Sequence, residues 1–134
     1  MTAAFSIGEQ AKGIMPYRVF YSFHDRQQFV SSDKPVSMEV ADIRQDLLAA
    51  LEGDGDFIGL IDEHGTVLQF IYDELGDRFW VEIPHSNERS SHGRWLPYEE
   101  CAVLLAELPE QFRPESFDGF EHRPWRTGRV PGHR

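Results

Sequence analysis

Apolar and polar positions alternate along the middle of the chain and predict three antiparallel strands, at residues 57–61, 66–72 and 78–83. These segments are rich in the β-branched and aromatic side chains that favour strands. Short polar turns separate them, and Gly65 in the first turn suits a positive φ. The pattern is typical of a β-meander.

The same alternation assigns side chains to the two faces of the predicted sheet. In the third strand Phe79 and Val81 share one face, whereas Trp80 and Glu82 share the other. An antiparallel sheet often packs one face on the core and leaves the other hydrated. We therefore expect Trp80, Glu82 and Gln69 on the hydrated face.

A longer period predicts two helices. In residues 37–51 the spacing of the apolar residues gives one stripe, made of Val40, Ile43, Leu47 and Leu51. Residues 97–108 carry a second stripe and begin with a proline, which suits a first helical turn. The aromatic run at 17–23 predicts a fourth strand, with an edge segment at Phe29-Val30.

The remaining segments lack a clear period. We expect residues 84–94 to form a polar loop and residues 112–125 to lie across the body as an irregular strap. Residues 1–15 are expected to be loosely ordered, and residues 122–134 to form a flexible basic tail. The predicted fold is a single α+β domain over residues 1–121. It has an antiparallel sheet of about four to five strands, with two main helices packed on one face.

The net charge of the chain restricts the classes of molecule that it can bind. The 134 residues carry a net charge of −10, and residues 39–77 hold eleven acidic side chains against one arginine. Residues 121–134 are basic, with four arginines against one glutamate, so the body is more acidic than the total. Nucleic acids and anionic membranes are therefore poor ligands. A basic protein is favoured, chiefly through faster encounter.

Cysteine usage and hydropathy predict a cytoplasmic protein. The single cysteine, Cys101, cannot form an internal disulfide, and its apolar helical surroundings indicate a buried structural thiol. The N-terminus lacks the pattern of a signal peptide, and no apolar run approaches the length of a membrane span.

Metal and cofactor motifs are absent from the sequence. The six histidines are scattered and show no H-x-x-x-H or H-E-x-x-H spacing, so no metal site is predicted. His85 and His92 share the 84–94 segment, where they could meet with an acidic residue. No glycine-rich phosphate-binding loop occurs, and no cofactor is expected.

Catalytic residues are equally sparse. Ser86, Ser90 and Ser91 lie near His85 and His92 in sequence, but no G-x-S-x-G elbow orients them, which favours ordinary polar packing. Glu82 has two interpretations. It is a solvent-facing strand carboxylate, or it is desolvated by Trp80 beside it. No catalytic residue is assigned, and the protein is not expected to be an enzyme.

The order of motifs resembles that of bacterial immunity proteins of the Imm1 type, over roughly residues 55–121. The meander segments, the helix beginning Leu96-Pro97-Tyr98-Glu99-Glu100, and Arg113-Pro114-Glu115 followed by an aromatic-acidic close carry the resemblance. It implies a protein that blocks a cognate toxin of a polymorphic toxin system, often a nucleic-acid-acting enzyme.

We therefore expect an immunity protein that neutralises a basic toxin by stoichiometric occlusion of the toxin's active site. The predicted contact residues are Asp73, Glu74, Asp77, Trp80, Glu82, His85 and Glu88. Two alternatives remain open: a small ligand-binding or hydrolytic domain that uses Glu82 and His85, and an adaptor or chaperone for a secreted effector.

Overall fold

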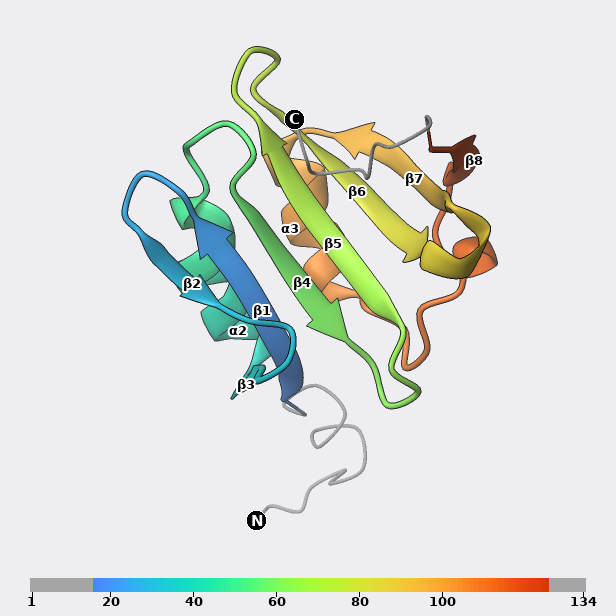
Figure 1. Cartoon of the computed structure of the whole chain (residues 1–134), viewed down its shortest axis with the longest axis horizontal. Helices are drawn as coiled ribbons and strands as arrows, with labels where there is room; N and C mark the ends of the chain where they lie inside the picture. Colours follow the sequence, from blue (N-terminus) through green and yellow to red (C-terminus); the bar gives the residue numbers. More distant parts are fainter. Residues whose placement is uncertain (1–15, 126–134) are drawn as a thin grey trace.

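The computed structural model describes residues 16–125, and its main element is an antiparallel β-sheet (Figure 1). Within this range eight strands follow the order β2-β1-β4-β5-β6-β7-β8, with β3 paired to β1. The strands are β1 (Tyr17–Phe23), β2 (Gln28–Val30), β3 (Val36–Met38), β4 (Phe57–Ile61), β5 (Val67–Asp73), β6 (Arg78–His85), β7 (Ser90–Leu96) and β8 (Glu121–Pro124). The expected loose order of residues 1–15 and most of the expected basic tail lie outside the described residues.

The predicted fold class is wrong in two respects: the sheet has eight strands rather than four to five, and the helices are short rather than two main helices packed on one face. The strand at 17–23 and the meander are present, but β3, β7 and β8 occupy segments predicted as a helix start, a polar loop and an irregular strap. Strand pairing needs backbone hydrogen bonds rather than apolar side chains, so polar segments can extend a sheet that has already formed. The expected tail boundary at residue 122 falls inside β8.

The helices are short. The segment expected as one helix over residues 37–51 begins at α2 (Val40–Asp42) and continues as the π-helix η1 (Ile43–Leu47) and the 3₁₀ turn η2 (Leu48–Ala50). This change of winding buries Leu47 and Leu48 together, although they are adjacent in sequence. The second helix, α3 (Tyr98–Ala106), spans nine residues.

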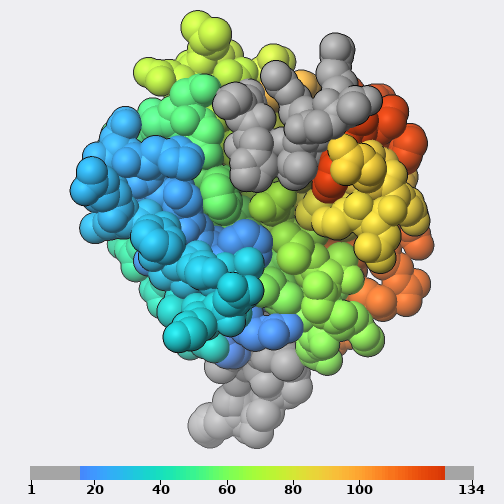
Figure 2. Space-filling model, in the orientation of Figure 1, coloured from blue at the N-terminus to red at the C-terminus, as the bar shows by residue number. Residues whose placement is uncertain are grey.

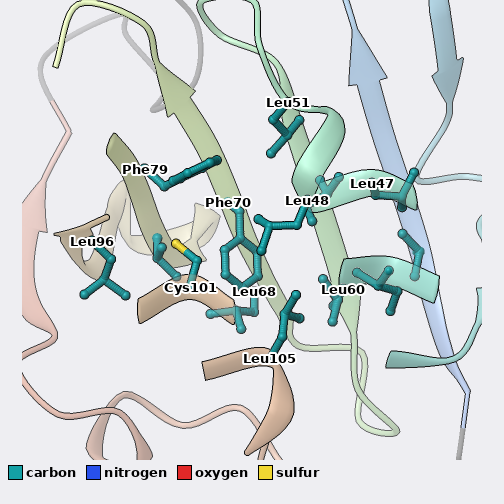
Figure 3. Close-up of a cluster of buried hydrophobic side chains, with 14 of the residues drawn as sticks. Leu47, Leu48, Leu51, Leu60, Leu68, Phe70, Phe79, Leu96, Cys101 and Leu105 are labelled. Carbon is teal, nitrogen blue, oxygen red and sulfur yellow. The ribbon is translucent and has the colours of Figure 1, made fainter. Parts of the chain in front are cut away.

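The core lies between the helices and one face of the sheet (Figure 3). Leu68 and Phe70 of the central strand β5 meet Leu48 on one side and Leu105 of α3 on the other. Cys101 is also in this cluster, and burial, followed by the charges of two neighbouring glutamates, raises the pKa of its thiol to about 12. The prediction of a buried structural cysteine is confirmed.

The opposite face of the sheet is also packed tightly in places. Phe20 lies over Gly59, and Trp80 lies so close to Gly93 that a Cβ added there would come within 2.9 Å of its ring and would also meet the carbonyl oxygen of Val81. Trp80 is 8% exposed. The expectation of a hydrated Trp80 is therefore wrong, because Gly93 of the neighbouring strand leaves room for its ring.

No helix within residues 16–125 is long and apolar enough to cross a membrane.

Candidate functional site

Three turns that are far apart in the sequence meet at one end of the sheet, at the top of Figure 1. They connect β1 to β2 (residues 24–27), η2 to β4 (residues 51–56) and β5 to β6 (residues 74–77). The second turn is joined to the first by His24, whose backbone N–H donates to Asp56 Oδ1 at 2.9 Å. It is joined to the third by the N–H of Glu74, which donates to Asp54 Oδ1 at 3.1 Å. We call this region the acidic end.

Acidic side chains predominate at the acidic end. Arg26 and Arg78 are its basic residues, and each is in an ion pair, with Glu52 at 3.3 Å and with Asp73 at 3.2 Å respectively. Within the described chain no lysine or arginine pairs with the remaining exposed carboxylates, which are Asp25, Asp54, Glu74 and Asp77. The acidic end therefore carries an excess of negative charge that a basic surface could neutralise.

One large apolar side chain projects from the acidic end. Leu75, at the tip of the β5–β6 hairpin, is 99% exposed. This hairpin stands out from the body at the top of Figure 2. Exposed single leucines are common on protein surfaces. This one shares its turn with the carboxylates of Glu74 and Asp77, so a partner drawn by charge would also meet an apolar contact there.

The hairpin is held in shape by Tyr72 and Asp77. The Tyr72 hydroxyl donates to Asp77 Oδ1 at 2.9 Å. This hydrogen bond, together with partial burial and the charges of three nearby carboxylates, raises the pKa of Tyr72 to about 12. Asp77 itself has φ of 49°, the left-handed conformation that closes the four-residue turn. The carboxylates of the tip are thus presented on a defined turn.

A second group of predicted residues lies in the middle of the sheet, on the face away from the helices. Glu82 is 0% exposed. Its Oε1 accepts from Trp80 Nε1 at 2.8 Å and its Oε2 accepts from Gln69 Nε2 at 2.9 Å. The guanidinium of Arg123 in β8 lies 5.2 Å from the Trp80 ring centroid. The interpretation in which Glu82 is desolvated is the one the structure supports.

A third group lies at the far end of β6, roughly 20 Å from the acidic end by the rise of a strand. His85 ends β6, and Glu88 lies in the following 3₁₀ turn η3 (Ser86–Glu88). His85 Nε2 lies 3.0 Å from His92 Nδ1 of β7. Because side chains alternate between faces along a strand, His85 and Glu82 project from opposite faces. The two residues proposed for a hydrolytic pocket are therefore not brought together.

The candidate nucleophiles are not assembled either. Ser90 and Ser91 are buried, and neither hydroxyl has a hydrogen-bond partner among the described residues. His85 pairs with Ser90 across the strands, yet its imidazole contacts His92 instead. Within residues 16–125 no group of three or more histidine, cysteine or acidic side chains is arranged to hold a metal ion.

The seven predicted contact residues thus form three separate groups rather than one patch. Sequence reasoning found the β5–β6 turn but missed Asp25, Asp54 and Leu75, which complete the acidic end. Asp25 and Asp54 are separated from the turn by many residues, and only the pairing of β1, β4 and β5 brings them close. Their position in polar turns was the one feature of the sequence that could have indicated them as contact residues.

No protein-family model matches the chain, and neither the curated proteins nor the solved structures include one that matches it.

Proposed function

We propose that this chain is an immunity-type inhibitor: a protein that binds a basic toxin and blocks the toxin's active site. The observation that carries the proposal is the acidic end, where three turns bring exposed carboxylates together and one of the turns presents the exposed Leu75. The resemblance of residues 55–121 to Imm1-type immunity proteins supports the same class.

Charge and apolar contact have different tasks in this proposal. The carboxylates accelerate encounter with a basic cleft, because complementary potentials steer diffusion. Leu75 supplies an apolar anchor that lengthens the lifetime of the complex once water is excluded. Nucleic-acid-acting toxins have basic clefts that bind phosphates, so the acidic end would compete with nucleic acid for the same surface.

The test compares two charge reversals of equal size. Asp25→Lys with Glu74→Lys changes the acidic end at two side chains for which the structure shows no ion pair or hydrogen bond. Glu63→Lys with Glu110→Lys makes the same change at exposed positions near the opposite end of the sheet. Stopped-flow association with a basic toxin domain, sought in the neighbouring reading frames, is measured from low to high salt.

We expect the acidic-end variant to associate about tenfold more slowly at low salt, with a weaker salt dependence. The control should change the association rate by much less, and Leu75→Ala should mainly raise the dissociation rate. Equal slowing by both reversals would show that net charge alone matters and that the acidic end is not the contact surface. Co-expression that fails to rescue growth despite tight binding would indicate an adaptor or chaperone instead.

A further inference from the structure

Three imidazoles lie side by side on the last three strands of the sheet. His85 of β6 and His92 of β7 have ring centroids 5.0 Å apart, and His92 lies 5.4 Å from His122 of β8. His92 is the direct cross-strand partner of both Ile83 in β6 and His122 in β8. We call His85, His92 and His122 the histidine row. It is distinct from the acidic end and lies beyond the proposed function.

The hydrogen bond within the row depends on protonation. His85 Nε2 and His92 Nδ1 are 3.0 Å apart, so one of these nitrogens donates and the other accepts. One proton can be added to the pair without loss of this bond. When both rings are protonated, both nitrogens are donors and the bond is replaced by repulsion between like charges.

The surroundings of His92 favour its neutral form. Partial burial, followed by the charges of His85 and His122, lowers the pKa of His92. Glu88 of η3 and Glu115 of the 3₁₀ turn η4 (Pro114–Ser116) act in the opposite direction, but more weakly. These four groups are the titratable neighbours that the adjacent strands and turns present to His92.

The strand that carries His122 is an edge strand of the sheet. β8 has four residues, all exposed, and it is paired on one side only, with β7. The residue that follows β8 adds one backbone hydrogen bond, from Trp125 N–H to the carbonyl of Arg89 at 2.8 Å. Edge elements of this kind open locally at a much lower free energy than the centre of a sheet.

We propose that the histidine row is a pH-sensitive latch: the edge-to-face contact between the neutral rings of His92 and His122 keeps β8 against β7, and repulsion between protonated rings in mildly acidic solution releases β8. Because β8 also places Arg123 over the ring of Trp80, its release uncovers the Trp80–Glu82 region on the other face. The latch thus couples an edge strand to the most buried polar contact of the sheet.

The direction of the pH effect follows from the shift at His92. A histidine whose pKa is lowered in the closed state binds a proton more readily once β8 is released, so the open state takes up more protons. The closed state is therefore fully favoured above the ordinary histidine pKa of about 6.5. It loses free energy as pH falls below that value, and the loss is complete below the lowered pKa.

Amide hydrogen exchange tests the latch on the full chain. Protection factors, corrected for the intrinsic pH dependence of exchange, are compared at pH 7.5 and pH 5.0 for β8 and for the central strand β5. We expect protection in β8 to fall by about tenfold or more, with β5 unchanged. Parallel loss in β5 would mean global acid unfolding and would overturn the proposal.

Substitutions identify the groups responsible. His92→Gln keeps a polar side chain of similar reach but cannot be charged, so most of the pH-dependent loss in β8 should disappear. His122→Gln, on the exposed edge, should reduce it as well and serves if the first variant does not fold. His64→Gln, in the exposed β4–β5 turn, is the matched control and should leave the loss unchanged. The same loss in the His92 and His122 variants as in the wild type would contradict the latch.

Discussion

Glu82 is the most completely buried acidic side chain of the described chain, and its neighbours in the sheet explain how it is accommodated. Moving a carboxylate out of water costs several kcal/mol unless hydrogen bonds replace its hydration. Trp80 and Gln69 each donate one such bond, from the same strand and from the next. At the scale of single residues, the main role of Trp80 is therefore to donate a hydrogen bond to Glu82, rather than to present an aromatic ring to a partner.

This contact predicts an asymmetry between two neighbouring tryptophans. Trp80→Phe removes the donor to Glu82 and should lower the free energy of unfolding by about 2–3 kcal/mol, the usual size for a bond to a charged group plus lost packing. Trp95→Phe, whose ring lies 5.3 Å from that of Trp80 but is half-buried, should cost less than about 1 kcal/mol. Urea denaturation measures both.

A double-mutant cycle with Glu82→Met, which keeps the length of the side chain but removes the oxygen acceptors, separates the hydrogen bond from the packing. The two changes should be non-additive by about 1 kcal/mol or more, because each removes the same interaction. Strict additivity, or an equal cost for the two tryptophan variants, would mean that the Trp80–Glu82 bond contributes little.

The sequence pattern predicts which face of the sheet these two side chains occupy, but not how deeply they are buried. The period of two correctly put Trp80 and Glu82 on one face, because it reflects backbone geometry alone. Their burial was not predictable in the same way, since the Trp80 ring packs where Gly93 of the neighbouring strand β7 carries no side chain. A glycine in a neighbouring strand carries no local signal that a ring will pack against it.

At the scale of elements, part of the acidity of the chain is structural. Asp62 is buried, and its Oδ1 accepts from the N–H groups of His64 and Thr66 at 2.8 and 2.9 Å, while its Oδ2 accepts from Phe112 N–H at 2.8 Å. One side chain thus closes the β4–β5 turn and attaches the strap that follows α3. Asp56 plays a similar part at the acidic end.

Removal of the Asp62 carboxylate should therefore destabilise two elements together. Asp62→Ala leaves three backbone N–H groups without their acceptor, and we expect a loss of about 3 kcal/mol or more in the free energy of unfolding. Glu63→Ala, at the exposed neighbouring position, should change it by less than about 0.5 kcal/mol. Chemical denaturation of both variants provides the comparison, and similar midpoints would refute a structural role for Asp62.

The elements that sequence patterns missed share one physical feature. The segment Ser90–Leu96 contains serine, histidine, glycine and arginine, yet it pairs along its length with β6 and partly with β8. Its strand conformation comes from backbone pairing with the apolar strand β6. This pairing is a tertiary effect, which the strand propensity of single residues does not include. Conversely, the apolar stripe at 40–51 correctly identified core residues but not the π and 3₁₀ turns that bury them.

At the scale of the whole molecule, the ionisable groups are separated between the two ends of the sheet, whereas the apolar core is continuous across one of its faces. The acidic end and the histidine row lie at opposite ends of β6, whereas the apolar core covers one face from β1 to β7. The sequence predicted the acidic excess but not the meeting of its turns, because that depends on strand order. The core cluster includes residues from η2 and from α3, which lie under different halves of the sheet (Figure 3).

A continuous core predicts that the molecule unfolds as one unit. Leu48→Ala in η2 and Leu105→Ala in α3 each remove a side chain that is 1% exposed, and each should cost about 2–5 kcal/mol. Val103→Ala, on the exposed side of α3, should cost less than about 0.5 kcal/mol. Far-UV circular dichroism reports the whole sheet, whereas tryptophan fluorescence reports β6, β7 and the residue that follows β8, where Trp80, Trp95 and Trp125 lie. For every variant the unfolding transitions measured by the two signals should coincide. Leu48→Ala should therefore shift the midpoint of the fluorescence transition as far as that of the dichroism transition. A Leu48→Ala variant that moved only the dichroism transition would divide the sheet into two independently unfolding parts.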